Sequence, residues 1–395
     1  MTTMTQQKTE LADASLGESL RFLATGLIPS VARGLFSPRP RAMKLLTRLN
    51  SDGRAIEFMD GIRSKYGGDG VRFMRGKMTV LWGEDAIREV LDNSATKYAS
   101  DAGAKKKGMS HFQPDALTLS RGEDWKDRRE FNEAVLDADA QRARIVDVVN
   151  EEVDRMRIGD GLTWGRWEQL FDHITLRVIF GNSARNDQDL TDLLEKLMQQ
   201  ANRIAGLKTT DDYYELYGKL DKYLANPDPY SLIARIKDAP QTDRTRIAQQ
   251  IPHWIFAMRD TLGANAYRAL ALAASGHAED LAGTLKEAMR LWPTTPLIAR
   301  EKVDDGSQVM ILNAFNHRDP SEPDFNQVKP DREHSYRFNH LSNGTQDCPG
   351  ADFVMLIGTA VLERMLSQYK LRYDGPTLDP PPTMLNFFET RFEVA

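Results

Sequence analysis

Apolar side chains recur with the period of an α-helix through most of the chain and alternate with polar ones only in short runs. Between residues 122 and 276, breaks rich in glycine, asparagine, aspartate and threonine separate a series of helical segments. The alternating runs at 71–76 and 78–83 predict a β-hairpin, and those at 307–315 and 380–395 predict further strands. The pattern therefore predicts a mainly α fold with small β-sheets.

The predicted strands lie near the two ends of the sequence, and strands this short are not stable without partners. They are expected to pair with each other across the helical middle of the chain. This pairing predicts a single domain over residues 1–395. The polar segment 1–15 is expected to be loose.

The longest helical run, residues 244–275, is apolar on more than one side after Ile251, which predicts that it passes through the core. Pro252 is expected to begin or kink this helix. Asp260 and Thr261 interrupt the apolar run. An acid and a hydroxyl inside a core helix are costly unless they bond locally or take part in chemistry, so this pair is a candidate for relaying a proton.

Cys348 is the only cysteine of the chain, and it lies where a loop-like run meets an apolar segment with helical spacing. The free N–H groups at the start of a helix favour negative charge. They would stabilise a thiolate, which is the form of cysteine that binds metals or acts as a nucleophile. Position alone also fits a small buried hydrophobe, the commoner fate of a free cysteine.

Composition narrows the class of protein. The chain is 41% hydrophobic and 28% charged with a net charge of −5, which is typical of a globular protein and does not favour a nucleic-acid-binding surface. A single cysteine excludes an intrachain disulfide and fits a reducing, cytoplasmic location. The most apolar early run, 19–36, is interrupted by Arg21, Pro29 and Arg33, so no membrane-spanning segment is expected.

One pattern places opposite charges on a predicted helix near residue 290. Glu287 and Arg290 lie one helical turn apart on a segment with a largely apolar side, and Arg332 follows at a distance as a possible further partner. A buried pair of this kind needs such partners to offset its desolvation. An exposed ion pair that contributes little to stability is the alternative.

Trp125 and Arg129 are also one helical turn apart, and Arg300 follows the Glu287 helix by about a turn and a strand. Arginine is the natural bidentate partner of a buried carboxylate. Two arginines that face inward beside an aromatic ring would suit a cofactor with carboxylate groups. Each residue taken singly is equally consistent with surface charge on an amphipathic helix.

The order of these patterns along the chain resembles the bacterial cytochromes P450, a family of heme-thiolate monooxygenases. The resemblance runs from about Trp125 to the C-terminus. The matching positions are Trp125 and Arg129 in a Trp-x-x-x-Arg helix, Ala257–Leu262 in an acid–alcohol helix, Glu287 and Arg290 in Glu-x-x-Arg, Asn316–Pro320, Arg332, and Gly344, Cys348 and Gly350 in a cysteine loop.

The resemblance implies a cytochrome P450 fold and a heme b whose iron is ligated by Cys348. It implies that Arg129 and Arg300 bind the heme propionates. The implied cofactor-binding positions are Trp125, Arg129, Arg300, Gly344, Gln346, Cys348 and Gly350.

The resemblance also assigns roles away from the cofactor. Asp260 and Thr261 are implied as the catalytic pair that delivers protons during oxygen activation. Glu287, Arg290 and Arg332 are implied as a structural ion-pair network.

The implied substrate pocket is mostly apolar and suits a small or medium organic molecule. Its positions are Met258, Arg259, Thr295, Leu297 and Phe387. Core packing is an equal alternative for Phe387. The sequence contains no flavin or iron–sulfur motif, so the resemblance implies a separate ferredoxin- or flavodoxin-type electron donor with its reductase, unless peroxide replaces them.

The cysteine loop departs from the family at two positions. Leu341 stands where the family has phenylalanine, and Gln346 stands where it has histidine or arginine. A neutral amide can bond a propionate but supplies no charge, so the two propionate arginines, with His111 or His340, would have to compensate. These departures keep open a non-catalytic carrier of heme or ligand.

The acid–alcohol helix departs as well. Met258 replaces a glycine and would narrow the pocket. A one-residue shift would put Leu262 at the alcohol position and turn Arg259 or Thr261 toward the iron. A related subgroup binds a substrate carboxylate with an arginine here and uses hydrogen peroxide. A peroxide-dependent or non-oxygenating heme-thiolate enzyme is therefore the alternative function.

Overall fold

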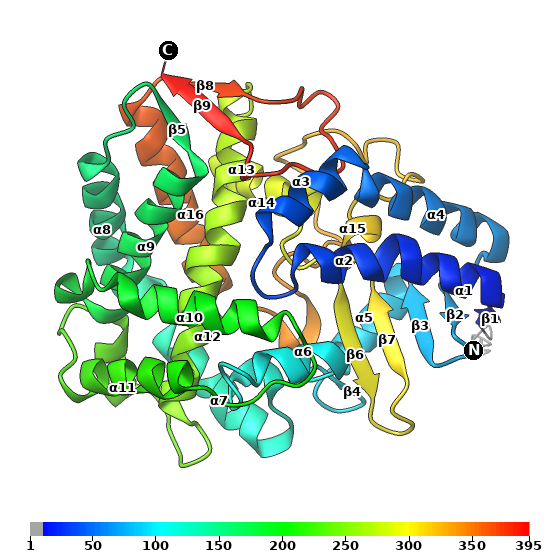
Figure 1. Ribbon diagram of the computed structural model, residues 1–395, viewed down its shortest axis with the longest axis horizontal. Coiled ribbons are helices and arrows are strands. Elements are labelled where there is room, and N and C mark those ends of the chain that lie inside the picture. The colour runs from blue at the N-terminus through cyan, green and yellow to red at the C-terminus, as the bar shows by residue number, and fades with distance from the viewer. Residues whose placement is uncertain (1–10, 395) are drawn as a thin grey trace, which may run out of the picture.

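The computed structural model describes residues 11–394 and consists mainly of helices with two small sheets (Figure 1). The described α-helices are α1 (Leu16–Phe22), α2 (Ile28–Arg33), α3 (Pro40–Arg48), α4 (Ser51–Tyr66), α5 (Glu84–Asp92), α6 (Gly103–Met109), α7 (Gly122–Val135), α8 (Arg142–Arg155), α9 (Trp164–Phe180), α10 (Gln188–Ala201), α11 (Asp211–Ala225), α12 (Ile251–Phe256), α13 (Gly263–Ala274), α14 (Leu281–Leu291), α15 (Asn313–Asn316) and α16 (Ala351–Gln368).

The larger sheet has the strand order β1-β2-β3-β7-β6-β4, and the smaller one has the order β5-β9-β8. The strands are β1 (Ala12–Asp13), β2 (Gly70–Phe73), β3 (Met78–Leu81), β4 (Tyr98–Ala99), β5 (Gly161–Thr163), β6 (Ile298–Lys302), β7 (Gln308–Ile311), β8 (Leu371–Asp374) and β9 (Arg391–Val394). The predicted hairpin is confirmed as the antiparallel pair β2–β3. The predicted pairing of strands from the two ends of the sequence is confirmed as well, because β3 pairs with β7 in parallel.

The helical side of the molecule is organised around α13, which runs through its middle (Figure 1). Every residue from Gly263 to Ala273 is buried, and α13 packs against α9, α14 and α16. Trp167 donates its indole N–H to the Gly263 carbonyl (2.8 Å), which fixes α9 against the start of α13. The apolar run that the sequence places in the core is therefore in the core.

The predicted long helix begins later than its pattern suggests. Residues 247–249 form a short 3₁₀ turn, and the helix starts at Ile251, with Pro252 in its first turn, where a missing N–H costs nothing. The helix then widens into a π-helical segment, η7 (Ala257–Leu262), before it continues as α13. This wide segment contains the predicted acid–alcohol pair.

Two segments are more ordered than expected. The segment 1–15 is predicted to be loose, and its residues 1–10 lie outside the described part of the chain. Of the rest, Ala12–Asp13 form β1, which pairs with β2, and Ser15 caps α1. The lysine-rich run after residue 101 has no clear helical period in the sequence but forms the short helix α6. Among the residues that the structure describes, no helix is both long and apolar enough to cross a lipid bilayer.

Candidate functional site

Cys348 lies at the end of a tight loop, three residues before α16 begins. Its N–H donates to the Leu341 carbonyl (2.9 Å), which closes the loop on itself. Cys348 is partly exposed as a residue. Burial raises the pKa of the Cys348 thiol, and the N–H of Gly350, which bonds to the sulfur, acts in the opposite direction. The loop therefore already supplies one donor that would stabilise a thiolate.

Gly344 has a backbone role in this loop. Its φ is +73°, and a Cβ at this position would lie 2.4 Å from the main-chain carbon of Leu91, at the end of α5. Next to it, the Thr345 hydroxyl donates to the Ser94 carbonyl (2.8 Å). Glycine at 344 thus allows the cysteine loop to approach the end of α5.

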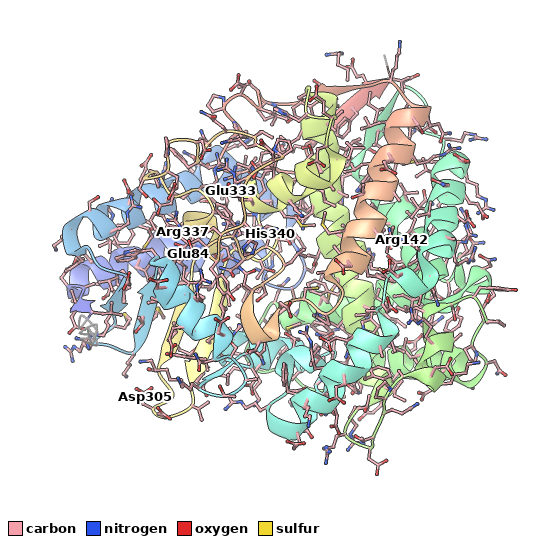
Figure 2. All side chains as sticks on the ribbon, turned by 180° about the vertical axis from the view of Figure 1, so that it is seen from behind. Glu84, Arg142, Asp305, Glu333, Arg337 and His340 are labelled. Atoms are coloured by element: carbon pink, nitrogen blue, oxygen red, sulfur yellow. The ribbon has the colours of Figure 1, made fainter. Side chains whose placement is uncertain are left out.

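The segment that leads into the cysteine loop is held by hydrogen bonds and an ion pair, and its residues Arg337 and His340 lie near Glu84 of α5 in Figure 2. Glu84 accepts hydrogen bonds from the Ser335 hydroxyl (3.0 Å) and the Tyr336 N–H (3.2 Å). Arg337 binds Asp319 (2.9 Å). His340 follows in the same segment, and burial lowers its pKa to about 4. His340 is therefore neutral near pH 7 and does not supply the charge that Gln346 lacks.

Glu287, Arg290 and Arg332 come together as a buried network. Arg290 makes a bidentate ion pair with Glu287, at 2.6 Å from Nε and 2.8 Å from Nη2. Arg332 Nε lies 3.1 Å from the same carboxylate. Glu287 and Arg290 are 3% and 1% exposed, so this is not the surface ion pair that the sequence left open. The remaining N–H groups of Arg290 bond three loop carbonyls, of His317, Phe325 and Gln327.

Arg129 lies beside the cysteine loop but is engaged by acids of its own chain. Its guanidinium donates to the Asp347 carboxylate (2.7 Å), to the Asp347 carbonyl (2.6 Å) and to Glu133 (2.6 Å). Asp347 thus faces Arg129, and the predicted propionate ligand is already neutralised. Trp125, one turn earlier on α7, is partly buried, and within residues 11–394 nothing accepts its indole N–H.

Arg300 has the opposite surroundings. Its side chain is 5% exposed and donates only to neutral oxygens, the Ser94 hydroxyl (2.9 Å) and the Ala299 carbonyl (3.1 Å). Burial lowers the pKa of Arg300 to about 10. No described carboxylate pairs with it, which is the condition expected of a residue that binds an acidic cofactor.

The helix that carries Asp260 has one side that is not packed. His253, Ala257 and Thr261 are partly exposed and recur at helical spacing, whereas their neighbours are mostly buried. Leu262 is fully buried and Met258 is 3% exposed, both within the main core. The structure therefore places Thr261, and not Leu262, on the open face.

Arg259 is buried and points toward acids on other helices. Its guanidinium lies 2.5 Å from Asp172 on α9, 3.1 Å from Glu195 on α10 and 2.7 Å from Asp260 Oδ1. The Oδ2 atom of Asp260 is buried and has no partner in the described chain. Burial raises the pKa of Asp260 to about 7, although Arg259 opposes this shift. The Asp260 carboxyl is therefore able to take up and release a proton near neutral pH.

The other predicted pocket positions differ in their exposure to solvent. Thr295 is exposed, and Leu297 is partly buried against the core beneath the larger sheet. Phe387 is 4% exposed and packs against Trp164 and Phe388, with the Arg268 guanidinium 5.1 Å from its ring centre. Phe387 is thus in the core packing that the sequence left as its alternative.

These residues fit the heme that the sequence implies. Cys348 is a free cysteine whose residue is partly exposed, Arg300 has no acidic partner among residues 11–394, and the Oε1 atom of Gln346 is buried without a partner there. An iron-bearing ring with carboxylate side groups would satisfy the thiol and the guanidinium, and the Gln346 amide would turn its NH₂ toward a carboxylate. Arg129 alone fits less well than expected, because Asp347 and Glu133 occupy it.

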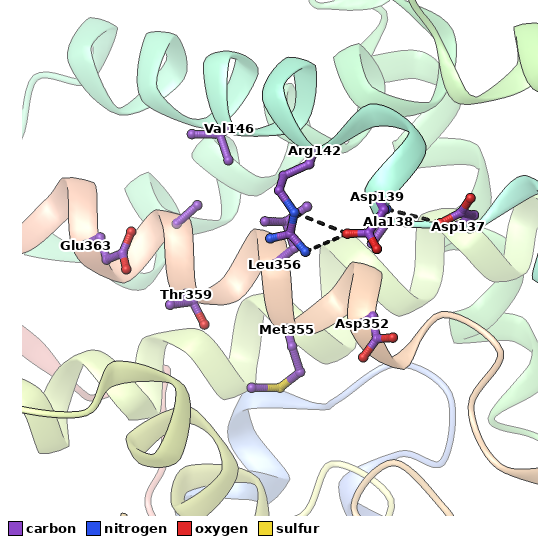
Figure 3. A pocket seen from close by; sticks show the side chains of 11 residues that line it. Asp137, Ala138, Asp139, Arg142, Val146, Asp352, Met355, Leu356, Thr359 and Glu363 are labelled. Atoms are coloured by element: carbon purple, nitrogen blue, oxygen red, sulfur yellow. Dashed lines mark hydrogen bonds and ion pairs between the residues drawn. The ribbon is translucent and has the colours of Figure 1, made fainter.

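A separate groove of about 630 Å³ lies on the outer side of α16, between this helix and the start of α8 (Figure 3). Arg142 binds Asp139 there (2.8 Å), and Met355 and Leu356 form part of the floor. None of the predicted cofactor or substrate residues lines this groove. It is therefore distinct from the predicted substrate pocket.

Comparisons with known proteins agree with the fold. No protein-family model matches the chain. A probable cytochrome P450 4s3 of Drosophila melanogaster is 29% identical over 112 residues, and cytochrome P450 4V2 of Mus musculus is 29% identical over 104 residues. These matches cover 24% and 22% of this chain, and the chain spans only 23% and 20% of the length of these relatives.

The crystal structure of CYP175A1 from Thermus thermophilus matches with a TM-score of 0.63 at 17% identity, over 84% of this chain and 91% of that one. The predicted cytochrome P450 fold is therefore confirmed. The partial matches to two further cytochromes P450 support a relationship to that family.

Proposed function

We propose that this protein is a heme-thiolate monooxygenase that binds heme b through Cys348 and inserts one oxygen atom of O₂ into a small or medium organic substrate. The observation that carries the proposal is the position of Cys348. The single thiol of the chain lies at the entry to α16, in a fold that matches a cytochrome P450 over 84% of the chain. When bound, the heme supplies the iron at which oxygen is activated, and the thiolate donates electron density that favours O–O cleavage.

The chain's own residues have three tasks in this proposal. The Cys348 loop holds the thiolate, with the Gly350 N–H bonded to the sulfur. Arg300 binds a propionate of the heme. Asp260 holds a proton at its unpartnered Oδ2 atom and passes it, with the Thr261 hydroxyl, toward the open face of the helix.

In the alternative function, Arg259 binds a substrate carboxylate, and hydrogen peroxide is the oxidant. No observation supports this alternative. Three carboxylates lie within 3.1 Å of the Arg259 guanidinium, so its charge is more than compensated. A further anion at this place would be repelled. We propose instead that electrons come from a separate ferredoxin- or flavodoxin-type donor with its reductase.

The function is tested by the difference spectrum of the purified, heme-loaded protein after reduction with dithionite and addition of carbon monoxide. We expect the Soret band of a thiolate-ligated iron–carbonyl complex. A protein that binds no heme, or that shows only the band of a neutral axial ligand, would overturn the proposal. Turnover with O₂ and reduced donor across a substrate panel then separates a monooxygenase from a heme carrier.

Replacing Asp260 with asparagine should slow product formation by about 10²-fold, the usual contribution of a positioned acid or base. In the wild type the rate should fall as pH rises through about 7, because the raised pKa of Asp260 leaves its carboxyl ionised above that pH. The Asp260→Asn variant should lose this dependence. The measurement is the rate of product formation per heme between pH 6 and pH 9, which spans that pKa by about a unit or more on either side.

The matched control for this variant is Asp172→Asn. Asp172 binds the same guanidinium, that of Arg259, at 2.5 Å but lies on α9. Its replacement should leave the rate within a few-fold of the wild type. Equal losses in both variants would show that the cluster only supports the fold, and an unchanged Asp260→Asn profile would remove Asp260 from the proton path.

A further inference from the structure

Two cations near the cysteine loop, Arg300 and Lys105, are close enough for the charge of Arg300 to act on Lys105, and neither forms an ion pair with a described carboxylate. Arg300 on β6 is 5% exposed and bonds only neutral oxygens. Lys105 on α6 makes no hydrogen bond or ion pair with any residue in the described part of the chain. Two like charges at close range are unfavourable unless an anion joins them.

The topology explains how Lys105 reaches Arg300. Strand β4, immediately before α6, pairs antiparallel with β6, with Ala99 opposite Glu301. Side chains alternate along β6, so Glu301 points away from Arg300 and instead binds Arg121 (3.2 Å). Strand β4 thus brings α6 to the edge of β6, on which Arg300 is carried.

Consecutive residues of a helix point about 100° apart, so Lys105 and Lys106 face different surroundings. Lys106 binds Asp101 (2.8 Å), and Arg121 lies 2.5 Å from the same carboxylate. Asp101 is thereby compensated. Burial, and then the charge of Arg300, lower the pKa of Lys105 to about 7, and the charge of Asp101 opposes this shift. His253 borders Lys105 from α12 and is neutral, because burial lowers its pKa to about 4.

The pair is connected to the cysteine loop. Arg300 donates to the Ser94 hydroxyl, and the Ser94 carbonyl accepts from the Thr345 hydroxyl (2.8 Å), three residues before Cys348. An anion bound by Arg300 is therefore held beside the group that Cys348 would ligate. Arg129, expected to share this task, is already bonded to Asp347.

From this geometry we infer that Lys105 and Arg300 together bind one carboxylate, and that it is a propionate of the heme. Lys105 thereby supplies the positive charge that Gln346 lacks in the cysteine loop. The inference rests on the proposed function, since it requires that the protein bind heme. A carboxylate on the substrate has the same chemistry and is distinguished by experiment.

The test compares heme retention in Lys105→Met, Lys105→Arg and the wild type. Methionine keeps the length of the side chain and removes its charge, whereas arginine keeps the charge. We expect heme transfer to excess apomyoglobin to be about tenfold faster or more in Lys105→Met, the effect of losing a charge-assisted bond. Lys105→Arg should stay near the wild type.

Lys107→Met is the matched control, because Lys107 lies on the same short helix and is exposed. It should lose heme at the wild-type rate. Equal rates of heme loss in Lys105→Met and the wild type would overturn the inference. If Lys105→Met at the same time weakens the spectral shift induced by an acidic substrate, the carboxylate that Lys105 binds belongs to the substrate and not to the heme. A wild type that binds no heme would overturn the proposed function itself, which is a separate result.

Discussion

Replacing Cys348 with alanine should abolish the thiolate-type Soret band of the reduced carbon monoxide complex. Cys348 is the only cysteine of the chain, so no other thiolate is available to the iron. The carboxylate of the preceding residue, Asp347, is bonded to Arg129. A heme retained by the variant would take a neutral axial ligand. The Soret band of its carbon monoxide complex would then lie at the wavelength typical of a neutral ligand and not at that of a thiolate. The thiolate-dependent O–O cleavage, and with it product formation, should be lost.

The experiment measures the difference spectrum and the heme content of Cys348→Ala beside those of the wild type, with far-ultraviolet circular dichroism to show that both are folded. Asp352→Asn is the matched control, because Asp352 is exposed on the first turn of α16, four residues after the cysteine. The control should keep the wild-type band. A thiolate band that survives in Cys348→Ala would exclude Cys348 as the axial ligand.

Short-range patterns predicted the parts of the site that lie within one element. The spacing of Glu287 and Arg290 put their side chains on one helix face, and the structure has them bonded there. The hairpin at 71–83 followed from alternation in the same way. Strand β1 was missed because two residues carry no period, and α6 was missed because glycines flank a run of lysines.

Ion pairs between residues far apart in the chain could not be predicted from the sequence pattern. Arg129 meets Asp347 across 218 residues, and Arg259 meets Asp172 across 87 residues. The sequence shows that these arginines need carboxylates, but many acids are equally available to each of them. Which acid is chosen depends on how helices pack, and that is fixed by the whole core.

Replacing Glu287 with alanine should cost about 3–5 kcal/mol of unfolding free energy, the range seen when one partner of a buried ion pair is removed. The charge of Arg290 would stay buried, since its side chain is 1% exposed and its other partners are neutral carbonyls. Arg332 would lose an ionic contact, and the Lys329 N–H would lose its acceptor at 2.9 Å. Urea unfolding followed by circular dichroism measures the change.

Asp139→Ala is the matched control for this loss. Asp139 and Arg142 form an ion pair with the same i, i+3 spacing, but their side chains are 83% and 58% exposed (Figure 3). Water screens such a pair, so its removal should change the unfolding free energy by less than about 1 kcal/mol. Equal losses in Glu287→Ala and Asp139→Ala would contradict a buried network at Glu287.

A double variant separates two effects of this network: the cost in stability of an unpaired buried charge, and the positioning of the loops that Arg290 binds. In Glu287→Met with Arg290→Met, neither member of the pair leaves its partner's charge uncompensated, and Arg332 keeps its contact with Asp324, so part of the lost stability should return. The three loop carbonyls that Arg290 binds would still lack donors, and these loops lead toward the cysteine loop. Stability should therefore recover further than heme retention does. Full recovery of both would mean that Arg290 only balances the charge of Glu287 and does not position the segment before Cys348.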